Sequence, residues 1–149
     1  MVKIRPLLAP ERTVKLTATV KDAVLEELAN KIIASPLIED ADKFMKAMYQ
    51  REQIMSTGIG LGIAVPHIRH ETVKDMIVGI GISKKGIDFN SLDKKPAHII
   101  FMIASPKASH REYLHLLAKI TSVLQDESFR EKLIAADVPE GVLELLKDD

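Results

Sequence analysis

A proline followed by a histidine, Pro66-His67, ends a glycine-rich apolar segment that begins at Gly58. Proline fixes its own φ and biases the preceding residue towards an extended conformation, so the chain enters His67 in a defined direction. A neutral imidazole has one ring nitrogen with a free lone pair, and can therefore act as a nucleophile near pH 7. That nitrogen can accept a phosphoryl group and pass it on, if the group is positioned and the charge on its oxygens is compensated.

Residues upstream of His67 offer that compensation. Arg51 is a cation, and Ser56 and Thr57 supply hydroxyl and backbone donors. A predicted helix that begins near Tyr113 offers a further neutral donor. We therefore expect Arg51, Thr57 and Tyr113 to support a phosphoryl group on His67.

Three glycines at alternate positions, Gly58, Gly60 and Gly62, suggest a phosphate-binding loop as an alternative. Nucleotide-binding glycine motifs open a helix or end in a lysine before Ser or Thr, whereas residues 64–66 continue a strand. We therefore expect one strand over residues 60–66, with the glycines on one face where another element approaches closely.

The histidines do not have the spacing of a metal site. His67 and His70 are three apart, and His110 and His115 would point about 140° apart on a helix. A zinc site needs three or four converging ligands. We therefore expect no metal and no other cofactor, with His115 facing solvent and His98 capping a strand or lying at the surface. A metal-dependent hydrolase is kept as an alternative function, and it predicts stoichiometric zinc.

The composition is balanced. Hydrophobic residues make up 46% of the 149 residues and charged residues 28%, with 21 basic and 21 acidic side chains. A nucleic-acid-binding protein usually has a basic excess. No apolar run approaches the ~18 residues of a membrane span, and the first ten residues lack the apolar core of a signal peptide. Without cysteine, thiol catalysis is excluded. We expect a cytoplasmic protein that binds no nucleic acid and does not insert into a membrane.

The order of elements predicts one α/β domain over residues 1–149. Helical spacing of apolar residues predicts helices over 21–34, 41–53, 111–124, 129–135 and 141–146. Extended segments are expected at 13–16, 60–66, 76–83 and 98–104, with a loop over 84–96. The last segment is apolar throughout, as in a central strand covered on both faces. Helices before and after the strands predict a sheet with helices packed on both faces.

The chain resembles the IIA domain of the fructose/mannitol class of the bacterial sugar phosphotransferase system (PTS EIIA, type 2), which includes a nitrogen-regulatory branch. The matching segments are Arg51-Glu52, residues 56–60, residues 62–67, residues 86–89, residues 104–106 and the helix Tyr113 to Leu124. The resemblance extends over roughly Leu16 to Leu146. It implies a mixed β-sheet with helices on both faces. It also implies that His67 takes phosphate from the phosphocarrier protein HPr and gives it to a IIB domain.

Two positions depart from the family pattern. Ile68 stands where the family usually has a small residue, and Tyr113 where it usually has a second histidine. A tyrosine hydroxyl can donate to a phosphoryl oxygen. His110, one turn earlier and about 60° away on the helix, is a further candidate for site support. The alternative for Tyr113 is a half-buried packing residue, and for Arg51 a charge that binds the last carbonyls of a helix.

Two functions follow from the resemblance. The first is a phosphoryl carrier in sugar transport, with HPr and a IIB domain as partners. The alternative is a nitrogen-regulatory type of module, which binds a regulatory protein partner in a phosphorylation-dependent way.

Overall fold

The computed structural model describes residues 2–149 and places strand β6, Ala97–Pro106, at the centre of the sheet. Every residue of β6 except His98 and Pro106 is buried. Alternate residues point to opposite faces: Ile99, Phe101 and Ile103 belong to one hydrophobic core, and their neighbours at 100, 102 and 104 to the other. The prediction of a central strand covered on both faces is confirmed.

Five further strands complete one mixed sheet. They are β1 (Thr13–Lys15), β2 (Gly58–Gly60), β3 (Ile63–Ala64), β4 (His67–His70) and β5 (Ile77–Ile87). The order is β1-β5-β6-β3-β2, and β4 also pairs with β6. The β5–β6 and β2–β3 pairs are antiparallel, whereas β1–β5, β3–β6 and β4–β6 are parallel.

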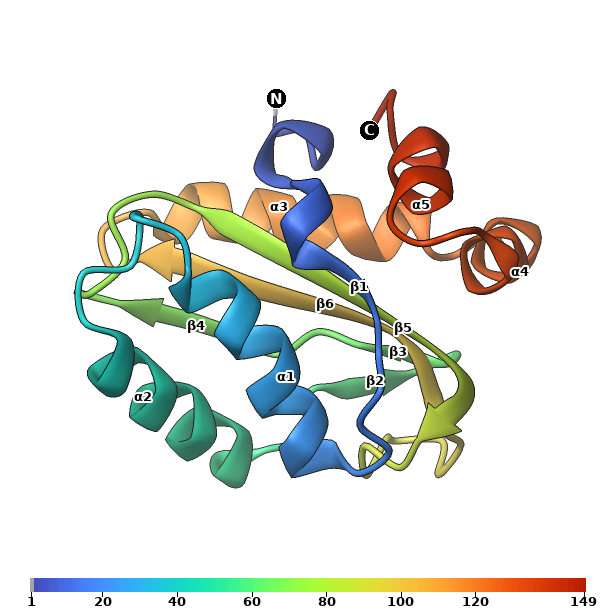
Figure 1. Cartoon of the computed structure of the whole chain (residues 1–149), viewed down its shortest axis with the longest axis horizontal. Coiled ribbons are helices and arrows are strands. Elements are labelled where there is room, and N and C mark those ends of the chain that lie inside the picture. Colours follow the sequence, from blue (N-terminus) through green and yellow to red (C-terminus); the bar gives the residue numbers. More distant parts are fainter. Residues whose placement is uncertain (1) are drawn as a thin grey trace.

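Helices cover both faces of this sheet (Figure 1). They are α1 (Lys21–Ile33), α2 (Ala41–Ile54), α3 (His110–Val123), α4 (Glu127–Ala135) and α5 (Glu140–Leu145). The first two pack on one face, and the last three pack on the other together with short 3-10 turns at residues 5–7 and 10–12. The predicted fold class, α/β with a mixed sheet and helices on both faces, is confirmed.

The glycine-rich segment differs from its prediction, because it forms a hairpin and not one strand. Strands β2 and β3 are antiparallel and join through a turn at Leu61 and Gly62. Gly60, Leu61 and Gly62 all have positive φ, at 92°, 59° and 77°. Glycine adopts this region without steric cost, so two of the three glycines serve the turn. The predicted close approach holds at Gly58, where an added Cβ would lie 2.4 Å from the Ser91 hydroxyl.

His67 begins a strand, whereas the sequence suggested that it ends one. Strand β3 stops at Ala64 and β4 starts at His67, and both run parallel to β6. Pro66 between them has no N–H to donate, although its carbonyl oxygen accepts from Ile103 N at 2.9 Å. The proline therefore interrupts the ladder next to the histidine.

Strand β5 is also longer than predicted and takes residues 84–87 from the expected loop.

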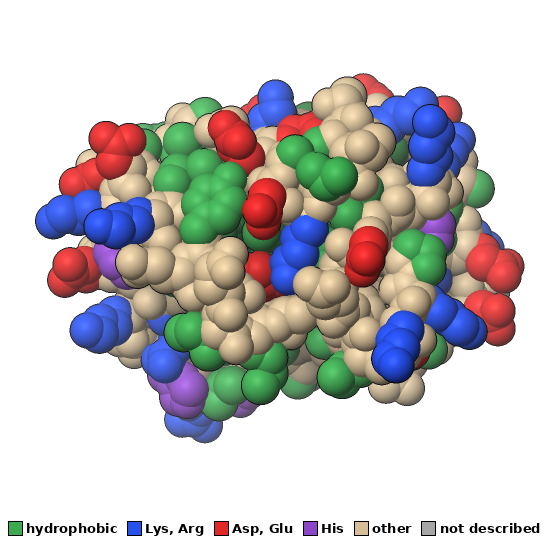
Figure 2. Space-filling model, turned by 90° about the horizontal axis from the view of Figure 1, so that it is seen from below, with side chains coloured by type: hydrophobic (Ala, Val, Ile, Leu, Met, Phe, Trp, Pro, Cys, Tyr) green, Lys and Arg blue, Asp and Glu red, His purple; other side chains and the backbone are tan. Residues whose placement is uncertain are grey.

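None of the helices within residues 2–149 has the length and apolar character needed to cross a membrane. On the face shown in Figure 2, charged side chains of both signs are interspersed, and hydrophobic side chains gather along the lower margin.

We predict that Gly62→Ala lowers the free energy of unfolding by about 1 kcal/mol, because φ is positive there and an L-residue is strained in that region. The nearest atom to an added Cβ is 3.6 Å away, so the cost is conformational and not steric. Urea unfolding measures it. Leu61→Asn is the matched control and should be neutral, since asparagine accepts positive φ. An equal loss of the free energy of unfolding in Gly62→Ala and Leu61→Asn would contradict the turn geometry.

Candidate functional site

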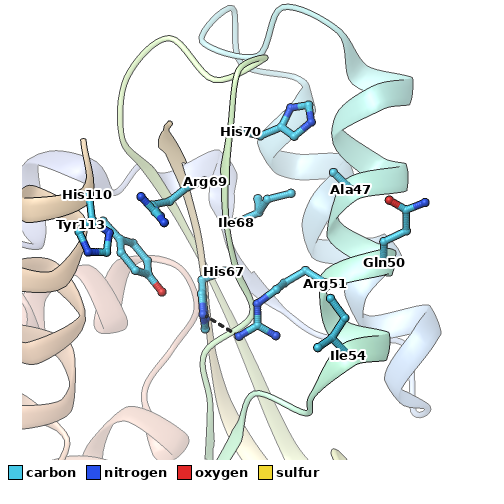
Figure 3. A pocket seen from close by; sticks show the side chains of 10 residues that line it. All are labelled: Ala47, Gln50, Arg51, Ile54, His67, Ile68, Arg69, His70, His110 and Tyr113. Atoms are coloured by element: carbon cyan, nitrogen blue, oxygen red, sulfur yellow. Dashed lines mark hydrogen bonds between the residues drawn. The ribbon is translucent and has the colours of Figure 1, made fainter. Parts of the chain in front are cut away.

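His67 lines a cavity of about 510 Å³ at the edge of the sheet. Two helices flank the cavity, and β4 forms its floor (Figure 3). Its lining comprises Ala47, Gln50, Arg51 and Ile54 of α2, all of β4 (His67, Ile68, Arg69 and His70), and His110 and Tyr113 of α3. The structure therefore brings together four residues that the sequence singled out: Arg51, His67, His110 and Tyr113.

The two ring nitrogens of His67 have different partners. Nδ1 lies 2.6 Å from the carbonyl oxygen of Val65, and Nε2 lies 3.1 Å from Nη2 of Arg51. A carbonyl oxygen only accepts and a guanidinium only donates, so the neutral ring carries its proton on Nδ1 and its lone pair on Nε2. The nucleophilic nitrogen is thus the one at the cavity, and Arg51 donates to it.

Arg51 has two roles. It lies in the last turn of α2, and its Nη1 donates to the carbonyl oxygen of Met55 at 3.2 Å. The helix-end role that the sequence left as an alternative is therefore present. The other guanidinium nitrogen contacts His67 at the same time, so one side chain serves both functions.

Tyr113 packs against the histidine ring. The ring centroids of His67 and Tyr113 are 5.4 Å apart, and Tyr113 is only 6% exposed. Burial raises the pKa of Tyr113, while Arg51 and Arg69 act in the opposite sense. The phenol therefore stays protonated at neutral pH and can donate. His110 lies one turn earlier on α3, also at the cavity.

The environment lowers the pKa of His67. Burial is the largest cause, and the Arg51 guanidinium lowers the pKa further. The hydrogen bond to Val65 and the carboxylate of Glu52 raise it in part. The net effect favours the neutral ring, which is the nucleophilic form, at pH 7.

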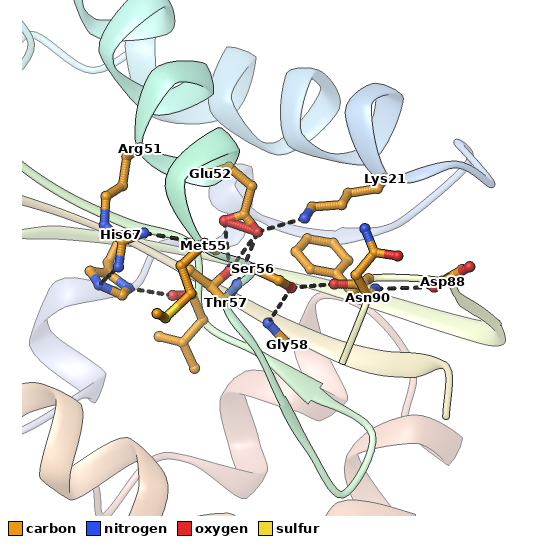
Figure 4. A network of polar contacts seen from close by, with 12 residues as sticks. Lys21, Arg51, Glu52, Met55, Ser56, Thr57, Gly58, His67, Asp88 and Asn90 are labelled. Carbon is orange, nitrogen blue, oxygen red and sulfur yellow. Dashed lines mark hydrogen bonds and ion pairs between the residues drawn. The ribbon is translucent and has the colours of Figure 1, made fainter. Parts of the chain in front are cut away.

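Thr57 lies beside the site and not in it. Its hydroxyl and its N–H bond to the Glu52 carboxylate, with Oγ1 and N at 2.9 and 3.1 Å from Oε1. Its carbonyl oxygen accepts from Val65 N at 3.0 Å. Ser56 Oγ in turn donates to the carbonyl oxygen of Phe89. The structure therefore connects Thr57 to His67 through the Val65 backbone and does not place its hydroxyl at the cavity (Figure 4).

Glu52, which belongs to the Arg51-Glu52 segment of the family resemblance, is a buried charge. Its side chain is 4% exposed and pairs with Lys21 Nζ at 3.1 Å, and that ammonium group lies 5.1 Å from the centroid of the Phe89 ring. The signal was present in the sequence, because Glu52 follows Phe44 and Met48 at intervals of four on the buried stripe of α2.

Strand β4 divides its side chains between two environments. Ile68 is 7% exposed and packs in the core formed with α1 and α2. His67 and Arg69 point to the other side, as the period of two requires. The unusual Ile68 thus adds to the packing of β4. Arg69 was also missed, although it lies two residues after His67 on a strand.

Of the remaining histidines, His70 lines the same cavity as His67 and His110, whereas His98 and His115 do not line it. His70 accepts from the Thr72 N–H through Nδ1, and the ring of His98 bonds to the Ser83 carbonyl oxygen. His115 is exposed, as predicted. In the part of the chain that the structure describes, no three His, Asp or Glu side chains gather in a way that could hold a metal ion.

Residues 8–149 match the family described as "Phosphoenolpyruvate-dependent sugar phosphotransferase system, EIIA 2". The fructose-specific EIIABC component of Bacillus subtilis is 32% identical over 147 residues, 97% of this chain and 23% of that protein. The chain therefore spans less than a quarter of this relative. The fructose-specific EIIA component of Haloferax volcanii is 33% identical over 86% of this chain and 83% of its own length. The nitrogen regulatory protein of Pseudomonas aeruginosa is 32% identical over 99% of this chain and 97% of its own length.

Solved structures agree with the fold. Nitrogen regulatory protein IIA-Ntr from Neisseria meningitidis superposes with a TM-score of 0.86 at 26% identity, covering 95% of this chain and 97% of that one. IIA mannitol from Escherichia coli superposes with a TM-score of 0.79 at 26% identity, covering 93% of this chain and 98% of that one.

The lowered pKa of His67 predicts a pH dependence of stability. Because the pKa of His67 is lower in the folded state, the unfolded chain binds a proton more readily than the folded protein does. The contribution of the neutral ring to the free energy of unfolding is therefore present above about pH 6.5 and is lost as the pH falls through the lower folded pKa. Urea unfolding between pH 7.5 and 5 should show a smaller loss of stability in His67→Gln than in the wild type. Identical pH slopes would contradict the lowered pKa.

We further predict that Lys21→Met destabilises the protein by about 3 kcal/mol, because it leaves the buried Glu52 carboxylate unpaired. The double variant Lys21→Met/Glu52→Gln removes both charges and should recover most of that loss in urea unfolding. A double variant no more stable than Lys21→Met would show that the pair is not coupled.

Proposed function

Because the chain belongs to the EIIA type 2 family of the phosphoenolpyruvate-dependent sugar phosphotransferase system, we propose that it is a cytoplasmic phosphoryl carrier. His67 accepts the phosphoryl group of phospho-HPr and gives it to a IIB domain. One observation carries this proposal: Nδ1 of His67 lies against the Val65 carbonyl oxygen, so the other ring nitrogen, Nε2, is left with its lone pair at the cavity beside a guanidinium.

The transfer step needs no proton to leave His67. The Nε2 lone pair attacks the phosphorus atom of phospho-HPr and forms a new P–N bond. The P–N bond of the donor breaks, and its electron pair returns to the donor's ring. The Nδ1 proton stays on His67, where the Val65 carbonyl oxygen stabilises the positive charge that the ring gains. In the second transfer, a nucleophile of the IIB domain attacks the phosphorus atom, and the P–N bond to Nε2 breaks with its electron pair returning to the His67 ring.

Arg51 and Tyr113 bind the phosphoryl oxygens in this proposal. Arg51 first exchanges its contact with Nε2 for one with an oxygen, which is a stronger, charge-assisted hydrogen bond. Tyr113 donates its phenolic O–H from the α3 side, and His110 supports it at the start of the same helix. Thr57 acts indirectly, through Glu52 and the backbone of Val65.

The cavity suits a protein donor. It lies at the edge of the sheet, and large exposed apolar side chains stand close to Arg51 in the sequence: Ile54 is 80% exposed and Met55 68%. Exposed apolar side chains beside a polar site are typical of protein interaction surfaces. A partner as large as HPr or a IIB domain can therefore reach His67.

We predict that the wild type becomes phosphorylated when it is incubated with enzyme I, HPr and phosphoenolpyruvate, and that His67→Gln does not. The amide of glutamine keeps a polar side chain of similar reach but has no nucleophilic nitrogen. Intact-mass spectrometry at neutral pH detects the added phosphate, and acid should remove it. His115→Gln is the matched control, because His115 is exposed and does not line the cavity, and it should behave as the wild type. Phosphate on both wild type and His67→Gln, or on neither, would contradict the proposal.

A regulatory role is the second candidate, and one observation favours it. The nitrogen regulatory protein of Pseudomonas aeruginosa is similar to this chain over 97% of its own length. In that case the protein would bind a regulatory partner in a way that the phosphorylation state of His67 controls. Pulldown with the unphosphorylated wild type and with His67→Asp distinguishes the roles. A transport carrier captures HPr and a IIB domain, whereas a regulatory module captures a kinase, transporter or regulator.

A further inference from the structure

Arg69 lies on the same cavity as His67 but has no part in the transfer described above. Both residues belong to β4 and are two positions apart, so their side chains point to the same side of the strand. Figure 3 shows the Arg69 guanidinium near the ring of Tyr113, on the other side of His67 from Arg51. The two arginines thus flank the nucleophilic ring.

The Arg69 side chain is free to bind a ligand. Among residues 2–149, no protein group forms a hydrogen bond or ion pair with it, and the residue is exposed. Arg51, in contrast, donates to the Met55 carbonyl oxygen and to His67 Nε2 before any phosphoryl group arrives. An unpaired guanidinium can approach an anion without first breaking a protein contact.

The oxygens of the phosphorylated state need hydrogen-bond donors in addition to Arg51. A phosphoryl group carries close to two negative charges at neutral pH. Within the site, the Glu52 carboxylate is already compensated by Lys21. Arg51 supplies one positive charge, and Tyr113 is neutral. The imidazolium that forms on His67 offsets part of the phosphoryl charge, but its Nε2 is bonded to the phosphorus atom and cannot donate to the oxygens. Arg69 lines the same cavity and is the further cation placed to donate to them.

We propose that Arg69 binds the phosphoryl oxygens of phospho-His67 from the side opposite Arg51, and so stabilises the phosphorylated form. This inference rests on the proposed function. The planar guanidinium can donate two parallel hydrogen bonds to one phosphoryl group, which a lysine in its place cannot do. Arg69 makes and breaks no covalent bond, because it contacts only the oxygens of the group that is transferred.

The equilibrium of phosphoryl exchange tests this role. A residue that contacts only the phosphorylated form shifts the equilibrium between phospho-HPr and this protein, whereas a residue that only guides the encounter changes rates. We expect Arg69→Gln to lower that equilibrium constant on the order of tenfold, as for the loss of one hydrogen bond to a charged group. The equilibrium constant of Arg69→Lys should lie between those of the wild type and Arg69→Gln. The shift should persist in 0.5 M salt, because a direct contact is screened less than long-range attraction.

Arg111→Gln is the matched control, because it removes the same charge from an exposed position on α3 that does not line the cavity. It should keep the wild-type equilibrium constant. An Arg69→Gln constant within twofold of wild type, or an equal loss in Arg111→Gln, would overturn the inference. If Arg69→Gln also unfolds at lower urea, Arg69→Lys decides: a partial recovery of the constant supports the contact, and none overturns it. Failure of the wild type to accept phosphate would instead remove the proposed function itself.

Discussion

The hydrogen bond between Nδ1 of His67 and the Val65 carbonyl oxygen decides which ring nitrogen is available for chemistry. A carbonyl oxygen accepts only from a protonated nitrogen, so it holds the proton on Nδ1 and leaves the lone pair on Nε2. Without this bond the ring would rotate, and either nitrogen would face the cavity. The position of Val65 is therefore the constraint on which the geometry of the site depends.

A chain of polar contacts fixes Val65 through its N–H. Lys21 on α1 compensates Glu52 on α2, Glu52 accepts two hydrogen bonds from Thr57, and Thr57 accepts from Val65 N. Pro66 then interrupts the strand pairing so that the ring can turn back to the Val65 carbonyl oxygen. Buried polar networks of this kind are rigid when every member is paired. The network couples the helix pair α1–α2 to the orientation of the imidazole.

The sequence was informative where a pattern has one dominant physical cause. Short-range rules account for three features: the apolar run of β6, the apolar face of each helix, and the defined direction in which the chain enters His67 after Pro66. The prediction of one strand over residues 60–66 was wrong, and a hairpin turn forms at Gly60–Gly62 instead, because alternating glycines fit a strand face and a turn equally well until φ is known. Thr57 was placed at the site by proximity along the chain, but its hydroxyl is bonded to Glu52. Pairing of this kind is a tertiary property. Arg69 was predictable from the period of a strand, had β4 been expected to begin at His67.

The measurement that tests this account most directly is the ¹⁵N NMR spectrum of the His67 ring after phosphorylation, in protein labelled at the histidine nitrogens. We expect phosphate on Nε2, with Nδ1 still protonated and hydrogen-bonded to the Val65 carbonyl oxygen. Phosphate on Nδ1 would contradict it, because that nitrogen would then have to leave the Val65 carbonyl oxygen before reacting.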